Sequence, residues 1–200
     1  MRDPFNILVA GVGGQGNLVC GRVLAEATIQ QGLRPVVGDT FGASRRGGSV
    51  LTHLRIGTTD WAPLIPRGEV DILLGLEPIE TLRAVLDFAG KRTIVIMSLS
   101  KVPTVDVSSG RTEYPALDKI VESIEKECKR VYVLDTHESL KESGSTRNLN
   151  TFMLGALSAI EENPLPKDVI RKAIETILGD DDINTSAFDL GAQQCKKLLG

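Results

Sequence analysis

The chain has 200 residues, of which 42% are hydrophobic, and a formal net charge of -3. A chain of this size can bury a substantial core, and its charge balance gives no electrostatic case for nucleic acid or an anionic membrane as a partner. No apolar run approaches the ~20 residues that span a bilayer. The first residues lack the basic and apolar regions of a signal peptide, so we expect a cytoplasmic protein.

Short apolar runs alternate with amphipathic segments, which predicts an α/β fold. We expect strands at 6–10, 34–38, 50–56, 71–76, 93–97 and 131–134. We expect helices at 18–30, 78–88, 116–129, 148–161, 166–178 and 186–199. Without repeats or a low-complexity linker, residues 1–200 are expected to form a single domain.

The predicted sheet is mixed but mostly parallel. Too few residues separate 34–38 from 50–56 for a crossover helix, so the second of these strands is expected to be antiparallel. Alternation within 50–56 also predicts that one face of this strand is wetter. The fold class is therefore a three-layer α/β sandwich that opens with a Rossmann-like strand–loop–helix unit.

The loop after the first strand is rich in glycine. Gly11, Gly13 and Gly16 match the pattern G-x-G-x-x-G, with Gly14 and Gln15 in between. Glycine permits close backbone approach and positive φ angles, and the following helix adds the positive end of its dipole. Such a loop is a candidate site for a phosphate, a carboxylate or a polar loop of a partner. A structural turn without a ligand is the alternative.

Asp39 makes a dinucleotide interpretation possible. It follows the second predicted strand at about the distance at which a ribose-binding acid is expected. The chain has no evident second nucleotide-binding half, and Gly14-Gln15 is unusual inside a dinucleotide loop. NAD or FAD binding is therefore an alternative hypothesis.

A second polar loop lies between the strands at 34–38 and 50–56. It contains Arg45, Arg46, Gly47 and Gly48, and it is expected at the same sheet edge as the first loop. A guanidinium group offers a planar fork of donors that can pair with phosphate or carboxylate. The alternative is an exposed turn with two solvated cations.

The remaining polar candidates favour structural roles. His53 and His137 have no metal ligand or nucleophile nearby in the sequence. Glu77 and Glu80 flank a helix start, where helix capping is the expected role, although they also border the same edge. The acidic run 179–182 is expected to be a solvated turn.

The cysteines also suggest no catalytic or metal centre. Cys20, Cys128 and Cys195 are far apart and lack the spacing of a zinc or iron–sulfur site. They are expected to be ordinary thiols in a reducing compartment.

Several motifs together resemble the gamma-type domain of 2-oxoacid:ferredoxin oxidoreductases, and within it the beta subunit of indolepyruvate ferredoxin oxidoreductase. The resemblance covers nearly the whole chain. The motifs that carry it are Gly11–Gly16, Arg46-Gly-Gly-Ser-Val50, Asp71-Ile-Leu-Leu-Gly-Leu-Glu77-Pro-Ile-Glu80, Asn148-Leu-Asn150 with Met153-Leu-Gly-Ala156, and Asn184-Thr-Ser-Ala-Phe188 with Gly191.

The resemblance implies a subunit of an enzyme that decarboxylates a 2-oxoacid oxidatively, with coenzyme A as acyl acceptor and ferredoxin as electron acceptor. It places thiamine diphosphate, Mg and the iron–sulfur clusters on a catalytic partner, so the chain is expected to form a hetero-oligomer and to be inactive alone. It implies no catalytic residue and no metal in this chain.

The resemblance also implies that the two loops face the partner or coenzyme A. The residues expected to bind are Gly11, Gly13, Gly14, Gln15 and Gly16 in the first loop, and Arg46, Gly47 and Gly48 in the second. Two further hypotheses stay open. One is a free-standing NAD- or FAD-binding oxidoreductase. The other is a non-catalytic scaffold whose loops serve only protein contacts.

Overall fold

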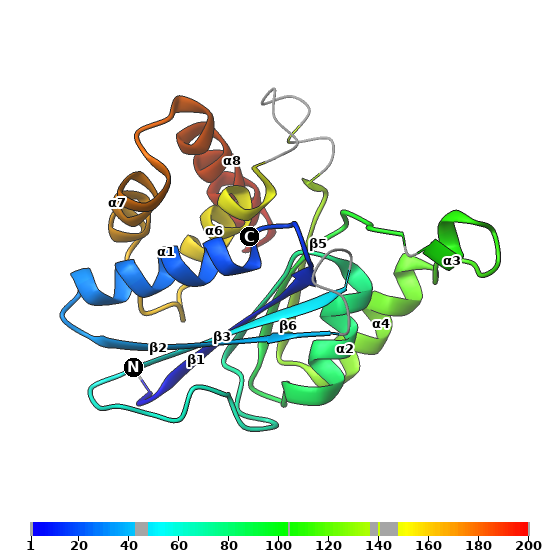
Figure 1. Cartoon of the computed structure of the whole chain (residues 1–200), viewed down its shortest axis with the longest axis horizontal. Coiled ribbons are helices and arrows are strands. Elements are labelled where there is room, and N and C mark those ends of the chain that lie inside the picture. The colour runs from blue at the N-terminus through cyan, green and yellow to red at the C-terminus, as the bar shows by residue number, and fades with distance from the viewer. Residues whose placement is uncertain (1, 43–47, 104, 137–139, 141–147, 200) are drawn as a thin grey trace.

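A computed structural model describes residues 2–42, 48–103, 105–136, 140 and 148–199. Its centre is a six-stranded sheet in the order β2-β3-β1-β4-β5-β6 (Figure 1). The strands are β1 (Phe5–Val12), β2 (Arg34–Phe41), β3 (Ser49–Gly57), β4 (Ile72–Gly75), β5 (Ile94–Ser98) and β6 (Arg130–Leu134).

Helices cover both faces of this sheet. They are α1 (Asn17–Gln30), α2 (Pro78–Phe88), α3 (Val105–Ser108), α4 (Leu117–Glu127), α6 (Leu149–Ser158), α7 (Lys167–Leu178) and α8 (Asp182–Leu199). Helices α1, α6, α7 and α8 lie on one face, whereas α2 and α4 lie on the other (Figure 1). The three-layer α/β architecture predicted from the sequence is thus confirmed.

The direction of β3 is also as predicted. It runs antiparallel to β1 and to β2, whereas the pairs from β1 through β4 and β5 to β6 are all parallel. The tight connection from β2 leaves no room for a crossover, so β3 returns beside β2 as a hairpin partner. As a result, β3 separates β1 from β2.

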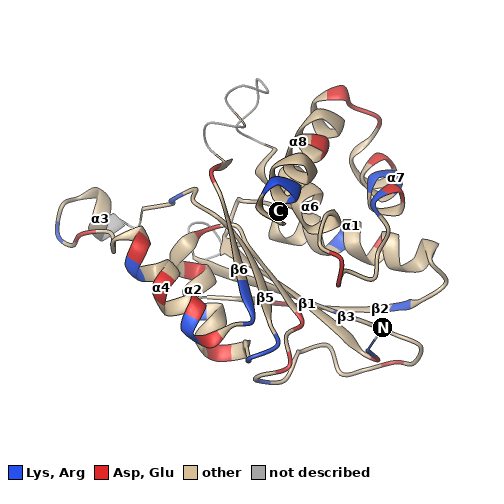
Figure 2. Cartoon of the chain, turned by 180° about the vertical axis from the view of Figure 1, so that it is seen from behind, with Lys and Arg blue, Asp and Glu red and all other residues tan. Residues whose placement is uncertain are grey.

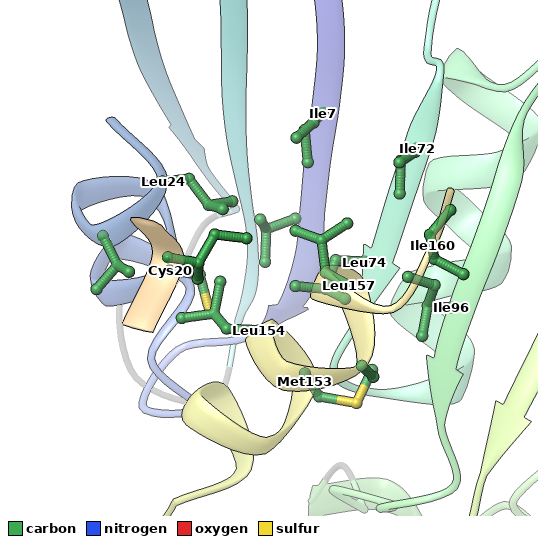
Figure 3. Packing of buried hydrophobic residues seen from close by; sticks show 14 of the residues in the cluster. Ile7, Cys20, Leu24, Ile72, Leu74, Ile96, Met153, Leu154, Leu157 and Ile160 are labelled. Carbon is green, nitrogen blue, oxygen red and sulfur yellow. The ribbon is translucent and has the colours of Figure 1, made fainter. Parts of the chain in front are cut away.

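Two hydrophobic cores flank the sheet because successive residues of a strand point to opposite faces. Ile7 of β1 belongs to the larger core with α1 and α6, and Leu8 to the smaller core with α2 and α4. Figure 3 shows the larger core, in which Cys20 of α1, Leu154 of α6 and Leu74 of β4 come together. Burial on both faces explains the nearly continuous apolar runs in β1, β4 and β5.

The prediction of a wetter face for β3 is wrong. His53 and Arg55 point to that face, yet they are only 1% and 7% exposed. The segment between β3 and β4 folds over them: the Ile65 amide donates to His53 Nδ1 at 3.2 Å, and Arg55 donates to the Ala62 carbonyl at 2.9 Å. A covering loop supplies partners that a strand pattern does not reveal.

Some helix limits differ from the sequence-based expectations. Helix α8 begins at Asp182 and not at Ser186, because the Asp181 side chain accepts a hydrogen bond from the Ile183 amide and caps the first turn. The short helix α3 was not predicted. Helix α2 occupies the expected residues, with Pro78 in its first turn.

The crossing of α6 and α8 depends on two glycines. A Cβ atom on Gly155 would overlap the carbonyl oxygen of Phe188, and one on Gly191 would overlap the carbonyl oxygen of Phe152. The backbones of α6 and α8 are therefore in direct contact at this crossing. Both atoms that would clash with an added Cβ are backbone carbonyl oxygens, which cannot rotate away as a side chain could.

Charged side chains are mixed on the outer surface. Acidic and basic residues are interspersed on α2, α4 and α7, as Figure 2 shows. Among the described residues, no helix is long and apolar enough to cross a membrane.

We expect Gly155→Ala to lower the free energy of unfolding by about 3 kcal/mol, because the added methyl group must push two helix backbones apart. Gly32→Ala is the matched control: Gly32 has φ +70° and nothing within 4 Å of its Cβ position, so only left-handed strain of about 1 kcal/mol is expected. Urea denaturation of both variants measures the difference. Equal losses would show that the crossing tolerates a side chain.

We expect acid to destabilise the protein through His53. Burial lowers the pKa of His53 below its usual 6.5, although the charge of Asp39 partly opposes this shift. As the pH falls below 6.5, His53 therefore binds a proton in the unfolded chain before it does so in the folded chain. The free energy of unfolding then decreases by up to about 1.4 kcal/mol for each further pH unit. Above pH 6.5, His53 contributes no pH dependence.

The His53→Asn variant keeps an acceptor for the Ile65 amide but does not titrate in this range. We expect the wild type to lose more stability than this variant between pH 7.5 and 5.5 in urea denaturation. Parallel stability curves for the two proteins would contradict the assignment to His53.

Candidate functional site

Most polar features of interest lie at one edge of the sheet. Strands β1, β2, β4, β5 and β6 all end there, and β3 begins there. In open α/β sheets, the crevice outside the carboxyl ends of the strands is the usual ligand position. The loop 13–16, the start of α2 and the start of β3 meet at this edge.

The glycine loop has the conformation that its residues predict. Gly14 and Gly16 have φ angles of +109° and +92°, in the left-handed region that favours glycine. Gly14 is exposed, with nothing within 4 Å of its Cβ position. Gly11 is needed for packing, because a Cβ there would lie 2.8 Å from Gln15 Oε1 and 3.0 Å from the Cβ of Leu76.

Gln15 joins two strand–helix units. Its Oε1 accepts a hydrogen bond from the Val12 amide at 2.8 Å, and its Nε2 donates to the Leu76 carbonyl at 3.0 Å. The first contact holds the loop against the end of β1, and the second ties it to the residue after β4. The Gln15 side chain is thus occupied in holding the loop.

The two predicted loops are neighbours in the structure. The Gly13 amide donates to the Gly48 carbonyl at 2.9 Å, which joins the glycine loop to the start of β3. This contact agrees with the expected common edge. Arg45, Arg46 and Gly47 lie outside the described residues.

The first turn of α1 faces the same edge without a side-chain cap. Gly16 is the N-cap residue and has no side chain with which to bind the first amides. Free N–H groups at a helix start, together with the helix dipole, favour an anion. Leu18 in this turn is 43% exposed, so the turn is accessible from outside.

Asp39 does not lie where a ribose-binding acid would be needed. It is within β2 and not after it, and its carboxylate accepts a hydrogen bond from Thr52 at 2.6 Å. Because β3 lies between β1 and β2, Asp39 is two strand spacings, about 10 Å, from β1. The geometry does not support the dinucleotide interpretation.

Glu77 is a buried helix cap, as expected, and it also holds a neighbouring loop. It is 1% exposed, and its Oε2 accepts from the Glu80 amide at 2.9 Å. Its Oε1 accepts from the Tyr114 hydroxyl at 2.5 Å. Burial and then this carboxylate raise the pKa of Tyr114, which keeps the phenol protonated. No local pattern in the sequence indicates the Tyr114 contact.

The cysteines are poor nucleophiles in this structure. Burial raises the pKa of Cys20 to about 12, and that of Cys128 and Cys195 to about 11, so the reactive thiolates are scarce at neutral pH. Among the described residues, no three His, Cys, Asp or Glu side chains are grouped as a metal site would need. His137 lies outside the described residues.

Two asparagines lie beside the loop for which the sequence predicted no role at this site, although Asn150 belongs to one of the family motifs. Asn17 donates to the Val50 carbonyl at 3.0 Å, while its buried Oδ1 has no partner in the described part of the chain. Asn150, from α6, lies against Gly16. The position of Asn17 directly after the loop could have indicated it, but only the fold brings Asn150 there.

Comparison with known proteins gives one family. Residues 6–194 match the pattern of the family described as pyruvate ferredoxin/flavodoxin oxidoreductase. Indolepyruvate oxidoreductase subunit IorB of Archaeoglobus fulgidus is 36% identical over 192 residues, which cover 95% of this chain and 94% of that protein.

Two solved structures share the fold. The gamma subunit of a keto/oxoacid ferredoxin oxidoreductase from Geobacter sulfurreducens has a TM-score of 0.67 at 19% identity, over 98% of this chain and 99% of that one. A 2-oxoglutarate:ferredoxin oxidoreductase from Magnetococcus marinus has a TM-score of 0.73 at 20% identity, over 98% of this chain but 32% of that one. The match over nearly the whole chain confirms the resemblance. This chain belongs to the pyruvate ferredoxin/flavodoxin oxidoreductase family, and it is similar over nearly its whole length to a small subunit of an indolepyruvate oxidoreductase.

Proposed function

We propose that this chain is the accessory subunit of an indolepyruvate-type, or other aryl 2-oxoacid, ferredoxin oxidoreductase in the cytoplasm. The Archaeoglobus relative named for indolepyruvate matches it at nearly full length. The chain would act as one domain within a hetero-oligomer. Alone, it would be inactive.

The proposed reaction needs a division of labour between subunits. A 2-oxoacid, coenzyme A and two oxidised ferredoxins give an acyl-CoA, carbon dioxide, a proton and two reduced ferredoxins. The carbon–carbon bond to the carboxylate breaks, a carbon–sulfur bond forms, and two electrons leave through ferredoxin. Thiamine diphosphate, Mg and the iron–sulfur clusters for these steps would be held by the catalytic partner.

The proposed contribution of this chain is to hold the phosphates of coenzyme A at the loop edge. The binding residues would be Gly11, Gly13, Gly14, Gln15, Gly16, Arg46, Gly47 and Gly48. Gly11 and Gln15 would shape the loop, because their contacts are internal. Backbone amides of the other glycines and the Arg46 guanidinium would contact the phosphates.

The Gly13–Gly48 hydrogen bond is the observation that carries this proposal. It brings the two candidate loops together beside the uncapped first turn of α1. The 2-oxoglutarate enzyme of Magnetococcus marinus, which shares the fold, is described with coenzyme A and succinyl-CoA bound, and this supports the choice of ligand.

The complex purified from its native source tests the function directly. We expect coenzyme-A-dependent reduction of a viologen dye with aryl 2-oxoacids, measured against pyruvate, 2-oxoglutarate and branched 2-oxoacids. The same assay on the chain alone should give no activity. A native preparation without thiamine, clusters or activity would contradict the proposal.

We expect a charge series at Leu18 to report whether an anion binds at the start of α1. Leu18→Glu should raise the KM for coenzyme A by about tenfold through repulsion of phosphate, which corresponds to ~1.4 kcal/mol. Leu18→Lys should lower this KM. Steady-state kinetics of the reconstituted complex measures both.

Leu18→Gln is the matched control, because it removes the same apolar contact without adding charge. A carboxylate in the first turn stabilises a helix, so Leu18→Glu should not lower the melting temperature of the chain. If all three variants have the same KM, the loop edge serves protein contacts and not an anion. That result would favour the scaffold alternative.

A further inference from the structure

Asn150 supports the glycine loop from the side of α6. A Cβ atom on Gly16 would lie 3.0 Å from Asn150 Nδ2 and 3.1 Å from its Cβ, so the Asn150 side chain packs directly against Gly16. The Asn150 carbonyl is also 3.9 Å from the Cys20 sulfur, one turn into α1. Residue 150 therefore contacts both ends of the first turn of α1.

The position of Asn150 is fixed by α8. Asn184 Oδ1 accepts a hydrogen bond from Asn148 Nδ2 at 2.9 Å and another from Thr151 Oγ1 at 3.2 Å. These two donors flank Asn150 in the sequence, at the N-cap and in the first turn of α6. A single oxygen atom of α8 thus holds the turn that presents Asn150 to the loop.

Asn184 is itself well placed for this task. It lies in the first turn of α8, three residues after the cap residue Asp181, and its Nδ2 is 3.5 Å from Asp181 Oδ2. The glycine crossing of α6 and α8 begins one turn further along, where Phe188 meets Gly155. The two helices are therefore held against each other both by polar contacts and by close packing.

We propose that Asn184 is a positioning residue for the glycine loop. It acts through Asn148 and Thr151 on Asn150, and through Asn150 on Gly16 and the first amides of α1. An effect of Asn184 on coenzyme binding rests on the proposed function. Its effect on the conformation of the loop is independent of that function.

The test compares Asn184→Ala with Asn184→Asp in the full chain. The aspartate keeps an oxygen for both donors, and alanine removes it. Cys20 donates its amide to the Gly16 carbonyl at 3.0 Å, so hydrogen exchange at residue 20 reports closure of the first turn of α1. Residue 24, one turn later in the same helix, is the internal reference.

Asn184→Ala removes both hydrogen bonds, and only part of that loss reaches the first turn of α1. We therefore expect exchange at residue 20 to accelerate by about fivefold, with less change at residue 24. Asn184→Asp keeps the acceptor but places a second carboxylate beside Asp181, so it should accelerate exchange less than Asn184→Ala does. Should Asn184→Ala fold poorly, Thr151→Val removes one of the two bonds with little change in shape and should give a smaller acceleration. Unchanged exchange at residue 20, or equal acceleration at both residues, would overturn the proposal.

The KM for coenzyme A in the reconstituted complex decides the proposed function separately. If the loop binds the coenzyme, we expect a higher KM in Asn184→Ala at unchanged kcat and a smaller increase in Asn184→Asp. Faster exchange with an unchanged KM would uphold the positioning role and count against coenzyme binding at the loop.

Discussion

The edge of the sheet depends on the amide group of Gln15. This one side chain meets the last N–H of β1 and the carbonyl that follows β4, so it supplies partners to two backbone groups that regular strand pairing leaves out. It can lie there only because Gly11 has no side chain. The Gly13–Gly48 bond then attaches the start of β3 to the same loop. Three chain segments are joined by short-range polar contacts, and the amides at the start of α1 stay free of side chains.

The position of β3 separates this fold from a dinucleotide-binding one. Both begin with a strand, a glycine loop and a helix, and both place the second strand parallel to the first. Here an antiparallel strand lies between those two, and Asp39 is moved away from the loop and bonded to Thr52. A local motif cannot reveal this difference, since it depends on which strand becomes the neighbour of β1.

Much of the architecture could be predicted because it follows from local patterns. The buried strands at 72–75 and 94–98 are continuous apolar runs, and Pro78 marks the start of α2. The shared edge of the two loops followed from strand order. What could not be predicted depends on contacts between distant segments. His53 and Arg55 look solvent-facing until residues 62–65 cover them, and Asn150 reaches Gly16 only through the packing of α6 on α1.

The glycine crossing of α6 and α8 has a mechanical consequence. Two helices whose backbones touch cannot slide or rotate past each other without separating, so they move as one rigid body. Asn150 belongs to that body, and Gly16 lies against it. The first turn of α1 can therefore move toward α6 only if α6 and α8 shift together. The loop edge is therefore rigid on its α6 side, and any adjustment of its shape is left to the opposite side, where Gly14 is exposed.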